Sequence, residues 1–380
     1  MKFDELRDFL DDELKFRHIP GQECLIYHNN DKVFDYCEGM ADIETGSPLK
    51  RDSIFRMYSM TKVITCVAAL QLFEKGRFLM TDPVYEYLPE FSTMTVARLM
   101  DNGIYEIVPA RETLRVQHLF NMTSGLCYPQ DLSYTGRMLG LLMDDPQNSN
   151  LSTLEMVRKF AGVPLLFEPG TRWKYGLSHD VLGGLIEAVS GKRFSDYLQE
   201  NIFDPLEMKD TFFHFTQERK ERLVSLYAFD EGSGELQRYE DDKDGAFESG
   251  GAGLKSTVPD YMKFANALCH FGVSPDGVRI LGRRTVEMMR MNCLSAEQQK
   301  CFDWVHMKGY GYGFGVRTMA FPEMGSNSTI GEFGWAGLAG TDLVIEPEEQ
   351  LTMVYAQQRI PNDEPYLHPR LRNMVNACLD

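Results

Sequence analysis

One segment of the chain carries apolar side chains around almost its whole circumference. The segment runs from Ser59 to Phe73, and its apolar positions are Val63, Ile64, Cys66, Val67, Ala68 and Leu70. A helix of this kind has no polar face to present to water, so it belongs in the core of the protein. Lys62, near its start, would then be withdrawn from solvent. The rest of the chain must supply layers that cover this helix on every side.

Strand patterns occur at both ends of the chain. Alternating runs at 24–28 and 32–36, joined by the polar turn 29–31, predict a hairpin. The runs 343–345 and 351–355 predict further strands, whereas helical periodicity dominates from about 60 to 226. This order predicts an α+β fold completed by both ends of the chain, with an inserted helical lobe. We expect an α/β domain at 1–95 and 240–380 and a mainly helical lobe at 96–239.

Composition excludes several classes of partner. With 39 basic and 56 acidic residues the net charge is −17, which argues against nucleic acid or an anionic membrane surface as a partner. No apolar run approaches 18 residues, so we expect no membrane span. The first 16 residues form an acidic amphipathic pattern without an export signal, which predicts a cytoplasmic protein. Eight scattered cysteines, with neither Cys-x-x-Cys nor His-Glu-x-x-His, lead us to expect no metal or other cofactor.

Two serine motifs can be set aside from the sequence. Gly-x-Ser-x-Gly is absent, and the run Ser178-His179-Asp180 cannot be a triad. Adjacent residues cannot place an imidazole between a hydroxyl and a carboxylate, so Ser178 is better interpreted as a helix N-cap.

The pattern Ser-x-x-Lys occurs twice, at Ser47–Lys50 and at Ser59–Lys62. A lysine can take the serine proton only if both lie on one helix face, about one turn apart. Ser47 precedes a proline in a polar turn, whereas Ser59 opens the apolar helix, so only the second pair qualifies. Taken alone, that pair also fits an N-cap serine followed by a lysine that extends to the surface.

Five segments, in this order, resemble the serine β-lactamase superfamily, and within it the class C β-lactamase and family VIII carboxylesterase branch. They are 54–62, 118–126, 167–175, 250–257 and 334–341. The resemblance implies a β-lactamase/transpeptidase-like fold, in which an antiparallel sheet built from both chain ends is flanked by helices. It also implies an inserted, mainly helical lobe.

The resemblance also implies roles for individual residues. Ser59 would be the acylated nucleophile and Lys62 its proton acceptor. Tyr175 would act with Lys62 as the general base and later activate the deacylating water. The oxyanion hole would consist of the backbone N–H groups of Ser59 and Leu338.

Two positions depart from the β-lactamase pattern, and both lie among the expected substrate-binding residues Leu177, Trp335, Ala336 and Gly337. Leu177 stands where that pattern has an asparagine, and Trp335-Ala336-Gly337 replaces Lys-Thr-Gly. The missing cation would contribute roughly 1.5–3 kcal/mol to holding an anionic substrate, so a neutral, apolar group is favoured.

These observations predict a serine carboxylesterase that cleaves a small-molecule ester through an acyl-enzyme. The alternatives are a β-lactamase, a D-amino-acid peptidase or another amide hydrolase on the same scaffold. A noncatalytic binding protein is a further alternative, and the sequence leaves the oligomeric state open.

Overall fold

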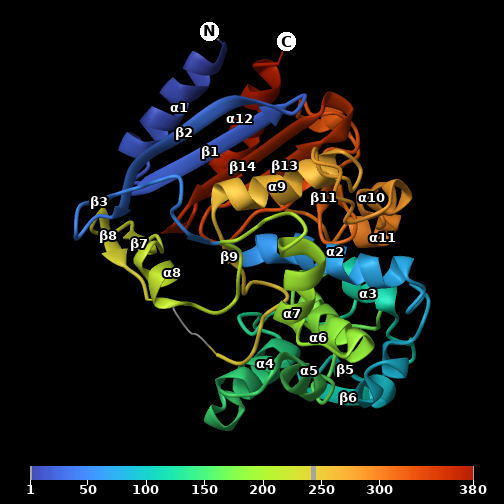
Figure 1. The fold of residues 1–380 in the computed structure, drawn as a ribbon. Helices are drawn as coiled ribbons and strands as arrows, with labels where there is room; N and C mark the ends of the chain where they lie inside the picture. Colours follow the sequence, from blue (N-terminus) through green and yellow to red (C-terminus); the bar gives the residue numbers. More distant parts are fainter. Residues whose placement is uncertain (1, 241–244, 380) are drawn as a thin grey trace.

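The structure is a computed structural model that describes residues 2–240 and 245–379. Its centre is an eight-stranded sheet in which each pair of neighbouring strands is antiparallel (Figure 1). In spatial order the strands are β10 (Tyr310–Tyr312), β11 (Arg317–Met319), β12 (Phe333–Gly334), β13 (Asp342–Glu346), β14 (Leu351–Gln357), β1 (Gly21–His28), β2 (Asp31–Asp42) and β3 (Ser47–Pro48). Because β1 pairs with β14, the two ends of the chain meet in the middle of the sheet. The predicted antiparallel sheet built from both ends is confirmed.

The predicted hairpin is the pair β1 and β2. Its turn residues, Asn29 and Asn30, both have positive φ angles, of 53° and 66°. A two-residue hairpin loop needs this left-handed backbone, and asparagine tolerates it better than most residues.

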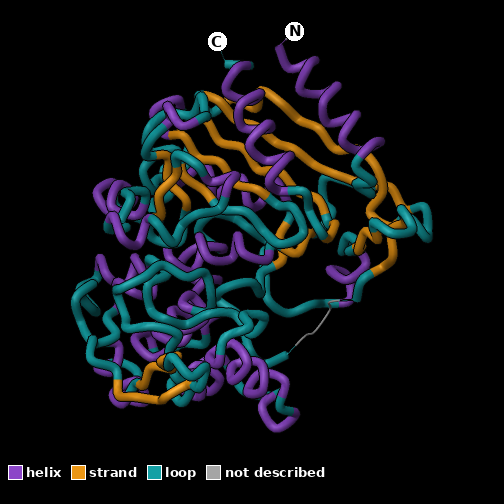
Figure 2. The backbone as a smooth tube through the Cα atoms, turned by 180° about the vertical axis from the view of Figure 1, so that it is seen from behind, coloured by secondary structure: helices purple, strands orange, loops and turns teal. Residues whose placement is uncertain are grey.

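The two faces of the sheet bury different side chains. On β14, Leu351, Met353 and Tyr355 belong to one apolar cluster, and Val354 and Ala356 to the other. Helices α1 (Lys2–Phe16) and α12 (Glu364–Ala377) cover the first face, as Figure 2 shows. Helix α9 (Val258–Cys269) packs on the second face, against β13, β14 and β1.

Helix α2 is the predicted core helix, and it lies between α9 and the helical part of the molecule (Figure 1). It spans Thr61–Glu74, and every side chain from 61 to 72 is buried. The helix begins two residues later than the apolar pattern predicted. Residues Tyr58–Met60 form the single 3-10 turn η1, and Tyr58 has a φ of 43°. This left-handed residue bends the chain just before Ser59, so the serine lies in a turn ahead of the helix.

The remaining elements are shorter. The helices are α3 (Val116–Phe120), α4 (Tyr134–Asp144), α5 (Thr153–Phe160), α6 (Ser178–Ser190), α7 (Phe194–Leu198), α8 (Gln217–Glu221), α10 (Arg283–Met289) and α11 (Ala296–Gln299). Single turns are η2 (Val84–Glu86), η3 (Pro89–Thr93), η4 (Pro146–Asn148), η5 (Gln199–Phe203), η6 (Val305–Met307), η7 (Pro322–Met324) and η8 (Pro347–Glu349). The small sheets pair β4 (Phe55–Arg56) with β9 (Lys255–Ser256), β5 (Thr95–Leu99) with β6 (Tyr105–Pro109), and β7 (Tyr227–Asp230) with β8 (Glu235–Arg238) and β15 (Arg359–Ile360).

The lower half in Figure 1 is mainly helical and contains α3 to α7. Strands β7 and β8 fall inside the predicted helical lobe but form a sheet with β15 near the carboxyl end, in which β7 pairs with both β8 and β15. The exact lobe boundaries at 95/96 and 239/240 stay a prediction.

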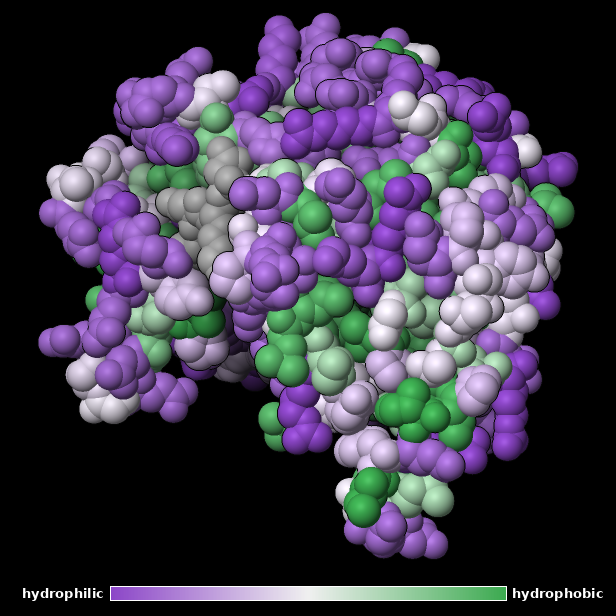
Figure 3. All heavy atoms as spheres, turned by 90° about the horizontal axis from the view of Figure 1, so that it is seen from below, coloured by the Kyte–Doolittle hydropathy of each residue, from purple (hydrophilic) through white to green (hydrophobic). Residues whose placement is uncertain are grey.

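The surface seen from the helical side is largely hydrophilic, with apolar side chains in separate patches (Figure 3). Exposed apolar residues of the helical part include Leu99, Ile104, Leu132 and Leu141. Across residues 2–240 and 245–379, none of the helices has the length and apolar character needed to cross a lipid bilayer.

Candidate active site

The second Ser-x-x-Lys pair forms a direct contact. Lys62 lies in the first turn of α2, and its Nζ donates a hydrogen bond to Ser59 Oγ at 3.1 Å. Ser59 is half-buried, whereas the Lys62 residue is 0% exposed. The alternative in which Lys62 extends to the surface is therefore wrong. Its charge lies inside the protein, next to the serine hydroxyl.

Lys62 has two further hydrogen-bond acceptors. Its Nζ donates to Tyr128 Oη at 2.8 Å and to the Gly251 carbonyl oxygen at 2.6 Å. With Ser59 these three acceptors use all three N–H bonds of an ammonium group. The sequence analysis missed both residues as partners of Lys62. The available signals were that Gly251 is the second residue of one recognised segment and that Tyr128 lies two residues beyond another.

Tyr175 lies beside the same lysine but contacts it differently. The Tyr175 ring centroid is 4.7 Å from Lys62 Nζ, and its Oη accepts a hydrogen bond from Trp335 Nε1 at 2.8 Å. Its ring is 5.5 Å from the ring of Tyr128. The structure thus brings Ser59, Lys62 and Tyr175 together as predicted and adds Tyr128. The catalytic roles of these residues stay predictions.

The two tyrosines differ in their surroundings. Burial raises the pKa of Tyr128 well above its usual range, because the phenolate form would lose hydration. Tyr128 is therefore a neutral phenol at ordinary pH, and it accepts from Lys62 rather than removing a proton. The general-base role of Tyr175 stays a prediction.

Gly176 explains why the two tyrosines lie side by side. A Cβ atom at this position would lie 2.6 Å from Cys127 Cα and even closer to the Leu126 carbonyl oxygen. Only glycine allows the chain after Tyr175 to pack this tightly against 126–127. That contact holds Tyr128 next to Tyr175.

Aromatic rings form one wall of the site. Around Tyr175 the ring centroids of Trp173, Trp304 and Trp335 lie at 6.2, 5.5 and 5.3 Å. Tyr312 packs edge-on against Trp335 at 5.1 Å. The sequence analysis did not identify Trp304, which lies in no recognised segment. The indole N–H of Trp335 donates to Tyr175 Oη, so Trp335 helps to orient the Tyr175 hydroxyl as well as forming part of this wall.

Leu338 lies in a turn near the segment that leads to Ser59. Gly340 N–H donates to the Gly337 carbonyl oxygen at 2.9 Å, which closes the turn around Leu338. A Cβ atom at Gly337 would lie 2.5 Å from the Met57 carbonyl oxygen, two residues before Ser59. This places the two ends of the predicted oxyanion hole in neighbouring backbone segments. The oxyanion role itself stays a prediction.

The other predicted substrate contacts are well covered. Leu177 is the N-cap residue of α6, is 3% exposed and packs in the main apolar core. Its side chain therefore has little surface to offer a substrate. Ala336 forms a backbone bridge with Asp342 and is also buried. The substrate-binding roles of these residues stay predictions.

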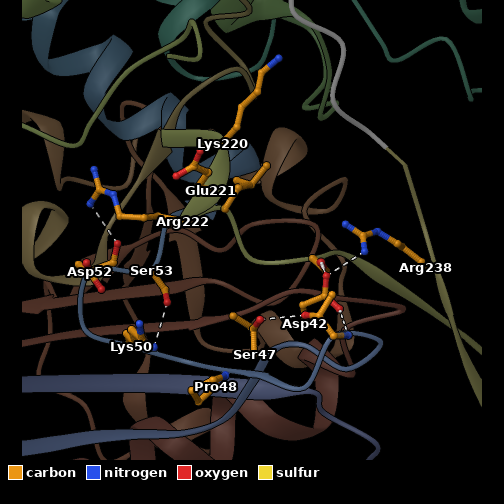
Figure 4. Close-up of a pocket in the computed structure, with 14 residues that line it drawn as sticks. Asp42, Ser47, Pro48, Lys50, Asp52, Ser53, Lys220, Glu221, Arg222 and Arg238 are labelled. Atoms are coloured by element: carbon orange, nitrogen blue, oxygen red, sulfur yellow. Dashed lines mark hydrogen bonds and ion pairs between the residues drawn. The ribbon is translucent and has the colours of Figure 1, made fainter. Parts of the chain in front are cut away.

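The two rejected serines have partners outside this site. Ser47 and Lys50 line a separate cavity of about 320 Å³ between β2, β3 and the chain around 220–225 (Figure 4). There Ser47 Oγ pairs with Thr45 Oγ1 at 2.8 Å, and the backbone N–H of Lys50 donates to Ser53 Oγ at 3.0 Å. Ser178 is the first residue of α6 rather than its N-cap, so the N-cap interpretation is wrong, and its Oγ pairs with Ser124 Oγ at 2.7 Å.

Replacing Tyr128 by phenylalanine tests the hydrogen bond between Lys62 Nζ and Tyr128 Oη. We expect kcat to fall roughly ten- to hundredfold, because a hydrogen bond to a charged group contributes about 1.5–3 kcal/mol and Lys62 would lose one of its three. Turnover of a chromogenic ester measures the effect, with Tyr85→Phe, at an exposed tyrosine, as the matched control. An unchanged kcat in Tyr128→Phe would show that the contact is not needed.

Comparisons with known proteins agree with this geometry. The family model described as Beta-lactamase matches residues 6–374. Esterase EstB of Burkholderia gladioli is 26% identical over 361 residues, covering 88% of this chain and 85% of that protein. Monacolin J acid methylbutanoyltransferase of Aspergillus terreus is 31% identical over 291 residues, covering 73% and 67%.

A solved structure shows the same fold. Unliganded simvastatin synthase from Aspergillus terreus superposes with a TM-score of 0.84 at 25% identity, covering 99% of this chain and 98% of that one. The resemblance inferred from the five sequence segments is confirmed. Because the family model spans nearly the whole chain, this protein belongs to the Beta-lactamase family.

Proposed function

We propose that this protein is a serine hydrolase that cleaves esters of neutral small molecules through an acyl-enzyme at Ser59. The observation that carries the proposal is the contact between Ser59 Oγ and the buried Lys62 Nζ. Trp335 lies beside Tyr175 and replaces the lysine of the β-lactamase pattern. The absence of a positive charge at position 335 supports an uncharged substrate. The names of two relatives, an esterase and a methylbutanoyltransferase, describe reactions in which an acyl group is moved.

The reaction follows from these positions. Ser59 Oγ bonds to the carbonyl carbon of the ester, and its proton passes to the pair formed by Lys62 and Tyr175, which reacts in the form in which one of the two has already released a proton. The negative charge on the former carbonyl oxygen is held by the backbone N–H groups of Ser59 and Leu338. The C–O bond to the alcohol breaks, and the alcohol leaves with that proton. Water, activated at Tyr175, then releases the acid and restores the Ser59 hydroxyl.

A second outcome of the same acyl-enzyme is transfer to an alcohol. An alcohol that takes the place of water at Tyr175 would yield a new ester instead of an acid. The 31% identity to a methylbutanoyltransferase supports acyl transfer as the second candidate reaction. Product analysis in the presence of a competing alcohol separates it from hydrolysis.

Ester and β-lactam turnover, measured side by side, tests the proposal. We expect p-nitrophenyl butyrate to be turned over with a kcat/KM at least ten- to hundredfold above that of a chromogenic cephalosporin. The physical reason is the absent charge-assisted contact, which contributes about 1.5–3 kcal/mol for an anionic substrate. Both activities are measured in wild type and Ser59→Ala.

Other outcomes identify the alternatives. Cephalosporin turnover equal to or above ester turnover would favour an amide hydrolase, either a β-lactamase or a peptidase. The absence of turnover and of acylation with any ester would favour a noncatalytic binding protein.

A further inference from the structure

The run Ser178-His179-Asp180 begins α6 and joins three segments that surround Lys62. Ser178 pairs with Ser124, at the end of the segment that leads to Tyr128. The His179 ring nitrogen Nε2 lies 3.1 Å from the Phe120 carbonyl oxygen and 3.5 Å from Cys66 Sγ on α2. Asp180 contacts the chain at 249–251. The three residues therefore connect the segments that lie next to Lys62, and they do not form a catalytic triad.

Asp180 is the buried acid of this run. It is 1% exposed, and its Oδ1 accepts hydrogen bonds from Ser249 Oγ at 2.5 Å and from Gly251 N–H at 3.2 Å. Its Oδ2 has no hydrogen-bond partner within residues 2–240 and 245–379. A buried carboxylate oxygen without a donor is costly, so its retention calls for a specific role.

Gly251 connects this carboxylate to the lysine. Its N–H donates to Asp180, and its carbonyl oxygen accepts from Lys62 Nζ at 2.6 Å. A Cβ atom at Gly251 would lie 2.6 Å from Asp180 Oδ2, and one at Gly250 would overlap the His179 carbonyl oxygen. The backbone at 250–251 thus rests directly on the start of α6, and only glycines permit this approach.

The charges around Asp180 come from few groups. Burial raises the pKa of Asp180, while the Ser249 hydrogen bond and the positive charge of Lys62 lower it. Tyr128 also faces it, since the Asp180 charge contributes to raising the Tyr128 pKa. His179 is uncharged at ordinary pH, because burial lowers its pKa to about 3. Glu248, next to Ser249, is bound elsewhere by Arg193 and His214.

We propose that Asp180 is a positioning residue that acts on Lys62 through Gly251. It fixes the direction of the Gly251 carbonyl group, and it adds one negative charge beneath the pair formed by Lys62 and Tyr175. The inference rests on the proposed function, because it assigns those two residues the task of taking the Ser59 proton.

The test is the pH dependence of labelling by a fluorophosphonate in wild type and Asp180→Asn. In this reaction Ser59 Oγ bonds to phosphorus, fluoride leaves, and the serine proton passes to the Lys62 and Tyr175 pair. Asparagine keeps the acceptor for Ser249 and Gly251 and removes the charge. Loss of a nearby anion disfavours the protonated form of either basic group, so we expect the acid limb of the rate profile to move to lower pH by about one unit.

Two further variants make the result specific. Ser178→Ala lies on the same turn of α6, pairs with Ser124 and should leave the acid limb where it is. Should Asp180→Asn fail to fold, Ser249→Ala removes a hydrogen bond that opposes the raising of the Asp180 pKa by burial, and so weakens the negative charge at this carboxyl. That variant should shift the limb in the same direction by a smaller amount.

The possible results distinguish the proposed reaction at Ser59 from the role of Asp180. Wild type that is not labelled at Ser59 would overturn the proposed function itself. Labelled wild type with an unmoved limb in folded Asp180→Asn would overturn the role of Asp180 alone. A slower rate with an unmoved limb would also overturn it, since that result assigns Asp180 to stability only.

Discussion

Ser59→Ala is expected to lower kcat for ester hydrolysis by about a thousandfold or more. The change removes the only atom that can form the acyl-enzyme at this site, while Lys62 keeps its contacts with Tyr128 and Gly251. Ser59 is half-buried in the turn η1, so the fold should tolerate alanine there. The measurements are turnover of p-nitrophenyl butyrate and the intact mass after fluorophosphonate treatment. Wild type should gain one adduct, located at Ser59, and the variant none.

The rejected serines supply the controls for this prediction. Ser47→Ala and Ser178→Ala should retain kcat within about twofold, because each hydroxyl pairs with another side chain outside the Lys62 cluster. An adduct on a serine other than Ser59, or a loss of activity in Ser47→Ala comparable to that of Ser59→Ala, would show that the nucleophile is assigned wrongly.

Lys62→Met should also reduce kcat by about a thousandfold, through a different physical effect. Methionine has a similar length and fits an apolar helix, but it can neither accept the Ser59 proton nor donate to the three oxygen atoms that surround Nζ. Residue 62 is fully buried, so removing a charge there relieves desolvation while leaving Gly251 and Tyr128 with one acceptor unpaired. These opposing effects should keep the free energy of unfolding within about 2 kcal/mol of wild type.

The combination of lost activity and retained stability is what distinguishes this role from a structural one. Urea unfolding and ester turnover of the same preparation measure both. Lys75→Met, at the exposed end of α2, is the matched control and should change neither quantity appreciably. Activity within tenfold of wild type in Lys62→Met would mean that the tyrosines alone remove the serine proton.

Much of the candidate site could be predicted from the sequence because its motifs are local. Ser59 and Lys62 are three residues apart, and the 3-10 turn that continues into α2 keeps them about one turn apart, so their contact follows from local structure. Tyr175 could be placed through the order of the recognised segments, and it lies near Lys62 as expected. Tyr128 and Asp180 could not be placed in this way, because both lie outside the recognised segments, and the segment that contains Gly251 does not indicate its contact with Lys62.

Two acidic residues near recognised segments show why the rest required the tertiary structure. The sequence does not decide whether Glu248 or Asp342 reaches the site, although acidic residues beside a glycine-rich strand are more often solvated or structural. In the folded protein Glu248 pairs with Arg193 at 2.6 Å, and Asp342 pairs with Arg317 at 3.2 Å and Arg372 at 3.1 Å. Both therefore hold together distant parts of the chain.

The sequence by itself determined the core helix, the hairpin and the strands at both ends, because apolar periodicity and turn residues act over a few positions. The tertiary structure decided which groups the buried Lys62 ammonium bonds. Tyr128 and Gly251 are 66 and 189 residues away along the chain. A charge removed from water bonds the acceptors that packing brings within about 3 Å, and here the packing of α2, α6 and the 249–251 backbone selects them.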